Sequence, residues 1–423
     1  MVWFTTDLRL SDNALLHEAV KKYEAIIPVY CLDKELLQQE QWGFKRMGAR
    51  RLKFLLESLN NLQQALASYG CHLQVVLGKP EEVIPPLAFE LGVTEVYAKK
   101  EVGSFELSSQ LQVANGLNAR SIEWTVLSTS TLYHPDDLPF SVRDIPEVFT
   151  DFRKRAERDG CIREELPIPA TITTPLLQPT EIPTLKSLGY QEPEVDSRAV
   201  IRFEGGEQAA LKRARHYILD SGCLSSYKET RNGLLGADFS SKLSPWLAWG
   251  CISPRTVYRM IKEYETKHEA NDSTYWLVFE LIWRDYFRFA MKKHKHKFFL
   301  KGGIQGKYIK TEHNQDALNR WINGETGVEF VDANMNELRL TGFMSNRGRQ
   351  NVASYLINDL KLDWRWGAAY FEEQLIDYDV ASNWGNWAYL AGVGNDPRGN
   401  RYFDIAKQAR QYDGAGQYRS TWL

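Results

Sequence analysis

The chain has 423 residues, a formal net charge of −2, and a composition that is 43% hydrophobic and 25% charged. This length accommodates two domains, and the sequence has no run of 18 apolar residues of the kind that predicts a membrane-spanning helix. The five cysteines are scattered and odd in number, which favours reduced thiols over a disulfide framework. No signal peptide is apparent, so we expect a cytoplasmic protein, or an organellar one whose targeting peptide has been removed.

Residues 1–127 alternate short apolar runs with amphipathic stretches, which predicts strands separated by helices. One such helix is expected at 46–69, where leucines recur at helical spacing. This alternation predicts an α/β domain of the Rossmann-like type, with a parallel sheet covered by helices on both faces. No glycine-rich nucleotide or phosphate motif is present. The predicted strands are Val2–Phe4, Ile26–Tyr30, Leu73–Leu77, Glu95–Ala98 and Ile122–Val126.

Residues 128–200 are rich in Pro, Thr and Ser, which predicts an extended interdomain connector on the surface and not a third core. From about Glu204 the pattern is helical, so we expect 201–423 to form a larger all-α domain. This second part is net basic, whereas residues 1–199 are net acidic. The difference favours a nucleic-acid-binding face on the helical part.

Residues 273–291 are predicted to form a helix with Ser273 as its cap. A charged row of Glu280, Arg284 and Arg288 runs beside its apolar stripe at a spacing of four residues. This row is either an internal Glu–Arg ladder or part of a cavity wall, into which Glu280 and Trp283 would protrude to bind a base. The apolar stripe consists of Trp276, Phe279, Trp283, Phe287 and Ala290.

Two polar clusters lie on either side of this helix in the sequence. Ser240, Ser241 and Ser244 crowd the start of a predicted helix, where they are either plain N-caps or ligands of an anion. The basic run Lys292–Lys297 is either a solvated helix end or a phosphate contact.

Residues 341–398 combine four tryptophans with a concentration of Arg, Asp and Asn. Because unpaired polar groups are costly to bury, this mixture predicts a cavity for a large ligand that is partly flat and apolar and partly polar. Residues 346–360 are predicted to be helical, which places Asn346, Arg349 and Gln350 on one face of the first turn. We expect a bidentate Arg349–Asp377 pair, as a ligand site or as a staple between helices. The tryptophans are Trp364, Trp366, Trp384 and Trp387.

The cysteines and histidines do not form a metal motif, since neither Cys-x-x-Cys nor His-x-x-x-His occurs. We also find no nucleophile paired with a base. The sequence therefore leaves a cofactor to carry any chemistry.

Two blocks, TGFMSNRGRQNVASYL and DYDVASNWGNWAYLAGVGNDPR, closely resemble the flavin-binding core of the photolyase/cryptochrome family, and within it the cryptochrome DASH branch. The resemblance extends over nearly the whole chain. Gln350 and Tyr389 match that branch, where ordinary dimer photolyases carry Met and Trp. Two departures are that Thr5 replaces the usual Arg of the family and that the first strand begins late.

The resemblance implies non-covalent FAD, with Asn383 facing the ring nitrogen that exchanges a proton. It implies that Glu280, Trp283, Asn346, Gln350 and Tyr389 form the catalytic site for a DNA lesion. The implied FAD contacts are Tyr227, Ser240, Ser241, Leu243, Ser244, Trp276, Glu280, Arg284, Asn346, Arg349, Asp377, Asp379 and Asn383.

The resemblance also implies an antenna, a folate of the methenyltetrahydrofolate type, held by Glu101 with Cys31 and Phe44 nearby; otherwise Glu101 is a solvated residue after a strand. Trp387 and Trp364 match the first two members of a photoreduction chain of three tryptophans. The third position is Thr311, so Tyr308, Trp366 or another aromatic residue takes the outer step, or photoreduction is impaired. We expect photoreduction to be slower than in a Thr311→Trp variant.

The implied activity is a deoxyribodipyrimidine photo-lyase reaction, which is blue-light-driven repair of cyclobutane pyrimidine dimers, mainly in single-stranded DNA, by a monomer. A blue-light signalling receptor is the alternative. Signalling cryptochromes often add a long C-terminal tail, whereas this sequence stops soon after the second block, which favours repair. Repair of the other dipyrimidine photoproduct requires histidines in the pocket, and none follows His313.

Overall fold

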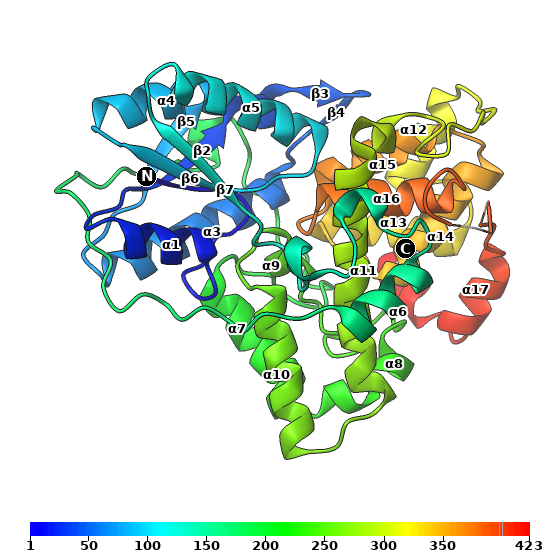
Figure 1. Cartoon of the computed structure of the whole chain (residues 1–423). Helices are drawn as coiled ribbons and strands as arrows, with labels where there is room; N and C mark the ends of the chain where they lie inside the picture. The colour runs from blue at the N-terminus through cyan, green and yellow to red at the C-terminus, as the bar shows by residue number, and fades with distance from the viewer. Residues whose placement is uncertain (397, 400) are drawn as a thin grey trace.

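The computed structural model describes residues 1–396, 398–399 and 401–423, so Pro397 within the second signature block lies outside the described residues. The N-terminal part contains a five-stranded parallel sheet in the order β5-β2-β1-β6-β7 (Figure 1). All five predicted strands are confirmed, with ends shifted by up to three residues. The strands are β1 Val2–Phe4, β2 Pro28–Asp33, β5 Gln74–Gly78, β6 Glu95–Lys99 and β7 Glu123–Leu127.

Helices cover both faces of this sheet, as the sequence predicted. On one face, α1 (Ala14–Lys22) and α3 (Ala49–Ala67) pack with Val2 and Phe4 of β1. On the other face, α4 (Pro80–Glu90) and α5 (Ser104–Asn118) pack with Trp3 of the same strand. Neighbouring residues of β1 thus face opposite layers, as the pleat of a strand requires. The expected α/β class is confirmed.

A short excursion after β2 was not predicted. It consists of α2 (Lys34–Gln38) and an antiparallel hairpin of β3 (Glu40–Gln41) and β4 (Phe44–Lys45). The hairpin extends from the α/β part toward the helical part (Figure 1). Its turn residues are Trp42 and Gly43, both with positive φ.

The segment predicted as an extended connector is only partly extended, which corrects the description of 128–200. Residues 149–159 form α6 (Phe149–Asp159), and its Phe149 and Phe152 are buried against the helical part. These rings need burial, so the first part of the segment joins the core. From residue 161 to α7 all residues are described, and this stretch contains no α-helix and many exposed side chains.

Helices make up the rest of the chain, as expected for an all-α domain. The long α11 (Asp272–His294) runs through the middle of the helical part (Figure 1). The remaining helices are α7 Glu207–Arg215, α8 Tyr227–Thr230, α9 Ser244–Ala248, α10 Pro254–Lys267, α12 Gln315–Asn323, α13 Glu329–Thr341, α14 Asn346–Ser354, α15 Trp364–Gln374, α16 Val380–Leu390, α17 Ile405–Tyr412 and α18 Gln417–Trp422.

Two predicted helices differ in detail from the sequence-based expectation. Helix α11 is capped by Asn271, whose side chain accepts from the backbone of Ser273 and Thr274, so the predicted cap at Ser273 is wrong. The hydroxyl of Ser273 instead accepts from the Lys228 backbone. The helix expected at 346–360 is present, but its last turn is a π-turn at Tyr355–Asp359.

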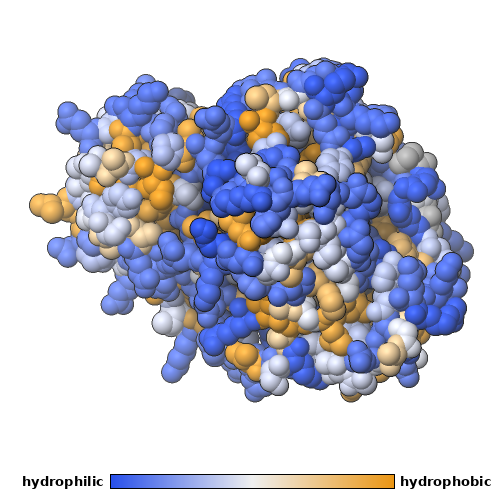
Figure 2. Space-filling view, turned by 90° about the horizontal axis from the view of Figure 1, so that it is seen from below, coloured by the Kyte–Doolittle hydropathy of each residue, from blue (hydrophilic) through white to orange (hydrophobic). Residues whose placement is uncertain are grey.

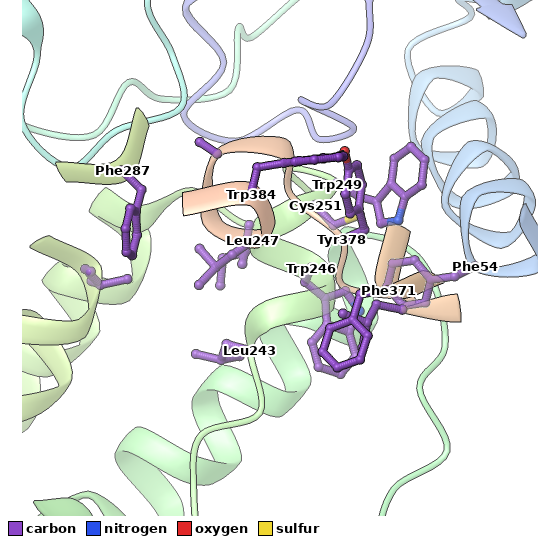
Figure 3. Close-up of a cluster of buried hydrophobic side chains, with 14 of the residues drawn as sticks. Phe54, Leu243, Trp246, Leu247, Trp249, Cys251, Phe287, Phe371, Tyr378 and Trp384 are labelled. Atoms are coloured by element: carbon purple, nitrogen blue, oxygen red, sulfur yellow. The ribbon is translucent and has the colours of Figure 1, made fainter. Parts of the chain in front are cut away.

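The two parts share one hydrophobic core. Phe54 of α3 packs against Trp246 of α9 with ring centroids 6.1 Å apart, and Trp249, Tyr378 and Trp384 continue the cluster (Figure 3). Ion pairs add to this contact, including Arg46–Glu372 at 3.1 Å. These contacts fix the α/β part against the helices that form the candidate site.

Unlike this core, the outer surface seen in Figure 2 is mostly polar. Seen from below, it is largely hydrophilic, with hydrophobic residues in small separate groups (Figure 2). Within the described residues, no helix is long and apolar enough to cross a membrane.

Candidate active site

A cavity of about 510 Å³ lies in the helical part, between α11, α14, α16 and the segment before α9. Its size is within the range of small-molecule and cofactor sites. The structure brings together on its wall most of the residues that were predicted from distant parts of the sequence. These are Tyr227, Ser240, Ser241, Leu243, Ser244, Glu280, Trp283, Arg284, Asn346, Arg349, Gln350, Asp377, Asp379 and Tyr389.

Arg349 and Asp377 form an ion pair on this wall, but the pair is not bidentate as expected. Arg349 Nη2 lies 2.8 Å from Asp377 Oδ2, while Nε of the guanidinium donates to the Met344 carbonyl at 2.9 Å. The second carboxylate oxygen, Oδ1, is buried and has no partner among the described residues. Oε1 of Gln350 is also buried and unpartnered there. The wall therefore offers unused acceptors, which a ligand with N–H groups would satisfy.

Asp379 is the N-cap of α16 and connects the cavity to a buried row of charges. Its Oδ1 accepts from Ser382 N at 2.8 Å, and its Oδ2 lies 2.5 Å from Arg288 Nη1. Burial would raise the pKa of Asp379, but the charges of Arg288 and Arg284 and the bonds to Ser382 lower it to about 2. This carboxylate is therefore ionised at neutral pH.

Arg284 faces the same cavity without an ion pair of its own among the described residues. It donates to the carbonyls of Leu247, at 2.9 Å, and Ser130. Burial lowers the pKa of the guanidinium, although arginine stays protonated at neutral pH. The hydrogen bonds of this half-buried guanidinium go to neutral carbonyls, so its charge is offset only by carboxylates further off, such as Asp379, and favours an anionic ligand in the cavity.

Glu280 does not take part in an internal ladder on α11. It forms an ion pair with Arg231 at 2.6 Å, while Arg284 and Arg288 bond to other elements. The interpretation of an internal Glu–Arg ladder is therefore wrong, and Glu280 and Trp283 line the cavity. Burial raises the pKa of Glu280, while Arg231 acts in the opposite direction.

An aromatic platform closes one end of the cavity. Trp283 stacks on Phe149 of α6 with ring centroids 3.5 Å apart and an interplanar angle of 11°. Its edge meets Tyr389 at 5.9 Å, and the Tyr389 hydroxyl accepts from Arg401 Nη2 at 2.5 Å. Sequence reasoning missed Phe149 and Arg401, since neither lies in a readable motif near the residues it contacts.

Two predicted cofactor residues do not reach the cavity wall. The side-chain amide of Asn383 instead donates to the Ala368 carbonyl at 2.9 Å, which holds it between α15 and α16. The Trp276 ring lies under Lys228 and Arg231, which are 5.1 and 5.4 Å from its centroid. Both are buried or half-buried and lie one helical turn from residues that line the cavity.

The basic run Lys292–Lys297 is likewise not part of the cavity wall. Lys293 Nζ lies 2.5 Å from Glu147, and His294 Nε2 lies 2.9 Å from the same carboxylate. These pairs fix the end of α11 to the segment before α6. The alternative role as a phosphate contact stays a prediction only for its exposed members, such as Lys295 and Lys297.

The predicted antenna residues are not all in one place. Glu101 and Cys31 line a cavity of about 120 Å³ beside the sheet, whereas Phe44 packs against Tyr370 with centroids 5.4 Å apart. Glu101 is buried and lies 2.9 Å from Lys99, so the interpretation of a solvated residue is wrong. Its other oxygen lies 3.9 Å from Arg288.

A third cavity, of about 310 Å³, lies between the β3–β4 hairpin, α5 and α16. Its wall combines aromatic rings with charges, including Phe105, Arg46 and Trp384. Glu106 lines both this cavity and the one beside the sheet, and its buried Oε2 has no partner among the described residues. Burial raises the pKa of Glu106, against the charge of Arg46.

Metal chemistry finds no support in the described residues, where no cluster of three or more Cys, His, Asp or Glu side chains is arranged to hold an ion.

Comparison with known proteins identifies the fold and the family. Residues 1–171 match the family described as DNA photolyase, and residues 276–423 match the FAD binding domain of DNA photolyase. The structure superimposes on the cryptochrome of Synechocystis sp. PCC6803 with a TM-score of 0.96 and 47% identity, covering 100% of this chain and 88% of that one. A class III photolyase from Agrobacterium tumefaciens gives a TM-score of 0.85 at 27% identity, covering 100% and 85%.

Curated relatives narrow the assignment. The cryptochrome DASH of Natronomonas pharaonis is 49% identical over 100% of this chain and 89% of its own length. That of Gloeobacter violaceus is 48% identical over 100% and 85%. The chain therefore belongs to the cryptochrome DASH branch of the photolyase/cryptochrome family, as its two signature blocks indicated.

Proposed function

We propose that this protein uses FAD and blue light to repair cyclobutane pyrimidine dimers, preferentially in single-stranded DNA. The observation that carries the proposal is the large cavity, where unused acceptors and Arg284, which has no ion pair in the described structure, meet an aromatic platform. The polar wall suits the polar part of a flavin dinucleotide, and the platform suits a nucleobase.

The residues present fit FAD. Ser240, Ser241 and Ser244 would hold the pyrophosphate with their hydroxyl and backbone N–H groups, beside Tyr227 and Leu243. Oδ1 of Asp377, unpartnered among the described residues, would accept from an N–H of the ring system. Bound FAD in its reduced state supplies, on illumination, the electron that opens the cyclobutane ring.

Arg284, Arg349 and Asp379 would set the charge around the ring system. The two guanidiniums favour negative charge on it, while the carboxylate of Asp379 limits that effect. Because these groups are already fixed by protein contacts, they need no reorganisation when charge moves.

The lesion would enter at the aromatic platform. Trp283 lines the cavity and would stack on a base, and Glu280 lines the same wall and would form a hydrogen bond with the dimer through its carboxyl group. Asn346 and Gln350 line the same wall and would supply amide contacts. This arrangement stabilises extra charge on the dimer without an acid–base step.

The preference for single strands rests on the cost of extracting the dimer. A lesion in duplex DNA must first be unstacked and flipped out, whereas a single strand largely avoids that cost. Tyr389, which the Arg401 contact holds against Trp283, and Gln350 make the pocket more polar than Trp and Met would. A more polar pocket binds a flipped dimer less tightly, so we expect poor repair of duplex DNA.

The direct test is a repair assay with FAD-loaded protein reduced by dithionite. White light should restore thymine absorbance in a dimer-containing single-stranded oligonucleotide, with little effect in the dark or on the duplex. Glu280→Gln should slow this repair, whereas Glu269→Gln, at an exposed position just after α10, should not. Protein that binds FAD but repairs no dimer would overturn the proposal and favour the alternative of a signalling photoreceptor.

We also propose that a folate antenna occupies the cavity beside the β3–β4 hairpin. Its mixed aromatic and charged wall suits a pterin, and Oε2 of Glu106, unpartnered in the described structure, would bond to the pterin amide edge. Added methenyltetrahydrofolate should transfer excitation energy to bound flavin, and Glu106→Gln should weaken its binding more than Glu101→Gln. Greater weakening by Glu101→Gln would instead place the antenna at Glu101, as the resemblance implies.

A further inference from the structure

The structure points to an outer electron donor at Trp42, a residue of the α/β part. Trp364 is the second predicted member of the photoreduction chain, and the residue that passes an electron to it has to be found. Thr311 accepts a hydrogen bond from Lys301 Nζ at 2.6 Å, and the Lys301 carbonyl accepts from Trp364 Nε1 at 3.0 Å. Residue 311 therefore lies near Trp364 but offers no ring that an electron could come from.

Neither Tyr308 nor Trp366, the two aromatic residues considered from the sequence, takes the place of the missing third tryptophan. Among the described residues, the ring that contacts Trp364 is Trp384, with centroids 5.8 Å apart and an interplanar angle of 74°. Trp366 instead contacts His313 at 5.0 Å, and Tyr308 is 91% exposed without a ring contact in the described structure. Trp384 is therefore the ring from which an electron can reach Trp364 by direct ring contact.

Within the described part of the chain, Trp384 leads to one oxidisable surface residue. It is 1% exposed, so it cannot meet a reductant in solution. Its other ring neighbours are Phe299 at 4.9 Å and Trp42 at 5.6 Å. A phenyl ring is much harder to oxidise than an indole, so the path continues to Trp42, which is partly exposed at the tip of the hairpin.

The inner end of the path follows from the packing of α15 on α16. Trp387 lies three residues after Trp384, on the same side of α16. Its ring covers Gly367, where an added Cβ would lie 2.2 Å from the indole. Gly367 in turn follows Trp364 by three residues on α15. Trp384 thus contacts the Trp364 ring directly and lies one helical turn from Trp387 on α16.

Polar contacts favour a positive charge on Trp384. Its Nε1 donates to the Tyr378 hydroxyl at 3.2 Å and to Glu372 Oε2 at 3.4 Å. A carboxylate beside an indole stabilises the cation that forms when an electron leaves, although Arg46, which pairs with Glu372 at 3.1 Å, reduces this effect. Arg365 lies 5.4 Å from the Trp42 centroid and acts the other way, but Asp363 neutralises it at 2.8 Å and water reaches the ring.

A second route from Trp387 ends inside the protein. Trp387 contacts Trp321 at 6.3 Å, Trp321 contacts Tyr370 at 5.7 Å, and Tyr370 contacts Phe44. Trp321 and Tyr370 are both buried, and the last ring is a phenyl group. This branch cannot exchange electrons with solution.

We propose that Trp42 is the outer donor in photoreduction of the bound flavin, through Trp384. Trp387 would give one electron to light-excited oxidised flavin, and Trp42 would refill the vacancy by way of Trp384, with or without Trp364. The oxidised Trp42 releases its indole N–H proton to water. A soluble thiol then returns one electron and one proton, and becomes a thiyl radical. This path rests on the proposed flavin site.

The test uses FAD-loaded, oxidised protein and laser-flash spectroscopy with a thiol donor. Trp42→Phe and Trp384→Phe should both lose the long-lived tryptophan radical and accumulate little reduced flavin. Trp366→Phe and Tyr308→Phe, as matched controls, should behave like the parent protein. Parent-like radicals in Trp42→Phe would overturn the inference.

Two further readouts distinguish electron donation by Trp42 from misfolding and from donation by another ring. Adding Thr311→Trp to Trp42→Phe should restore photoreduction, which a misfolded variant could not do. Without thiol, prolonged illumination in air should place oxidation products on Trp42 in peptide mass spectra, and their appearance on Trp366 or Tyr308 instead would contradict the path. Repair by dithionite-reduced Trp42→Phe should be normal, so failed repair or failed FAD binding in the parent protein would refute the proposed function separately.

Discussion

Arg349 binds only one oxygen of Asp377, with Nη2 2.8 Å from Oδ2, and leaves Oδ1 buried without a partner among the described residues. A purely structural staple would be expected to use both oxygens, since a fork of two bonds is the stronger arrangement. The single bond instead keeps an acceptor free beside the cavity. This relationship favours a ligand-binding pair over a staple between α14 and the segment before α16.

We therefore predict that Asp377→Asn weakens FAD binding. The amide keeps the shape of the side chain but removes the charge that holds Arg349 and one of the two acceptors. Loss of a hydrogen bond to a charged group costs about 1.5–3 kcal/mol, which should appear in a fluorescence titration of the apoprotein with FAD. Asp316→Asn, on the exposed side of α12, is the control and should not change the affinity. Equal affinities for all three proteins would support the staple.

The sequence predicted the sheet well because each buried strand leaves a compact apolar run. It missed the β3–β4 hairpin, which has two residues in each strand and no alternation to read. It also missed α6 because a proline-rich neighbourhood hid an amphipathic helix, in which Phe149, Phe152 and Ala156 share one buried face. Composition averaged over a long segment concealed a short local pattern.

At the site, the sequence predicted which residues gather but not how each side chain is oriented. The Asn383 amide bonds to the Ala368 carbonyl, and the Trp276 ring lies beside Lys228 and Arg231, and a motif does not specify such contacts. Glu101 was expected to bind a ligand, but Lys99 and Thr5 already bond to one of its carboxylate oxygens. Such competition between a ligand and protein partners depends on tertiary contacts from distant segments.

The Trp283 platform gives a prediction about lesion binding. Trp283→Ala should weaken binding of a dimer-containing single strand by about 1–3 kcal/mol, the usual value of stacking one base on an aromatic ring. The absorbance of bound FAD should be retained. Electrophoretic mobility shifts with fluorescent oligonucleotides would measure this. Trp366→Ala, half-buried on α15 outside the cavity, is the control, and a similar loss in both variants would contradict a specific role for the platform.

The corrected view of residues 128–200 predicts two different mutational responses. Phe152 is fully buried, and its ring lies 5.3 Å from Tyr286 and 6.0 Å from Phe289. Phe152→Ala should therefore lower the free energy of unfolding by about 3–5 kcal/mol. Leu176, in the extended part, is fully exposed, and Leu176→Ala should change stability by no more than about 0.5 kcal/mol. Urea denaturation followed by circular dichroism would test both, and a small effect of Phe152→Ala would restore the interpretation as a plain connector.

Glu337 on α13 predicts a pH dependence of stability near neutrality. The side chain is 2% exposed, and its Oε2 accepts from the Tyr418 hydroxyl at 2.6 Å. Burial raises the pKa of Glu337 from 4.5 to about 7, although Tyr418 and Lys242 oppose the rise. Between these two pKa values the folded protein holds a proton that the unfolded chain has released. Stability from this group is therefore complete at low pH and is lost as the pH rises toward 7.

Glu337→Gln should remove this dependence, since the amide does not titrate and still accepts from Tyr418. Relative to the parent protein, the variant should gain up to about 3 kcal/mol in the free energy of unfolding between about pH 5 and about pH 8. Urea denaturation at several pH values would measure the difference. Glu325 is an exposed residue after α12, and the free energy of unfolding of Glu325→Gln should differ from that of the parent by the same amount at every pH. A constant offset for Glu337→Gln as well would mean that the buried carboxyl is ionised throughout, stabilised by the charge of Lys242.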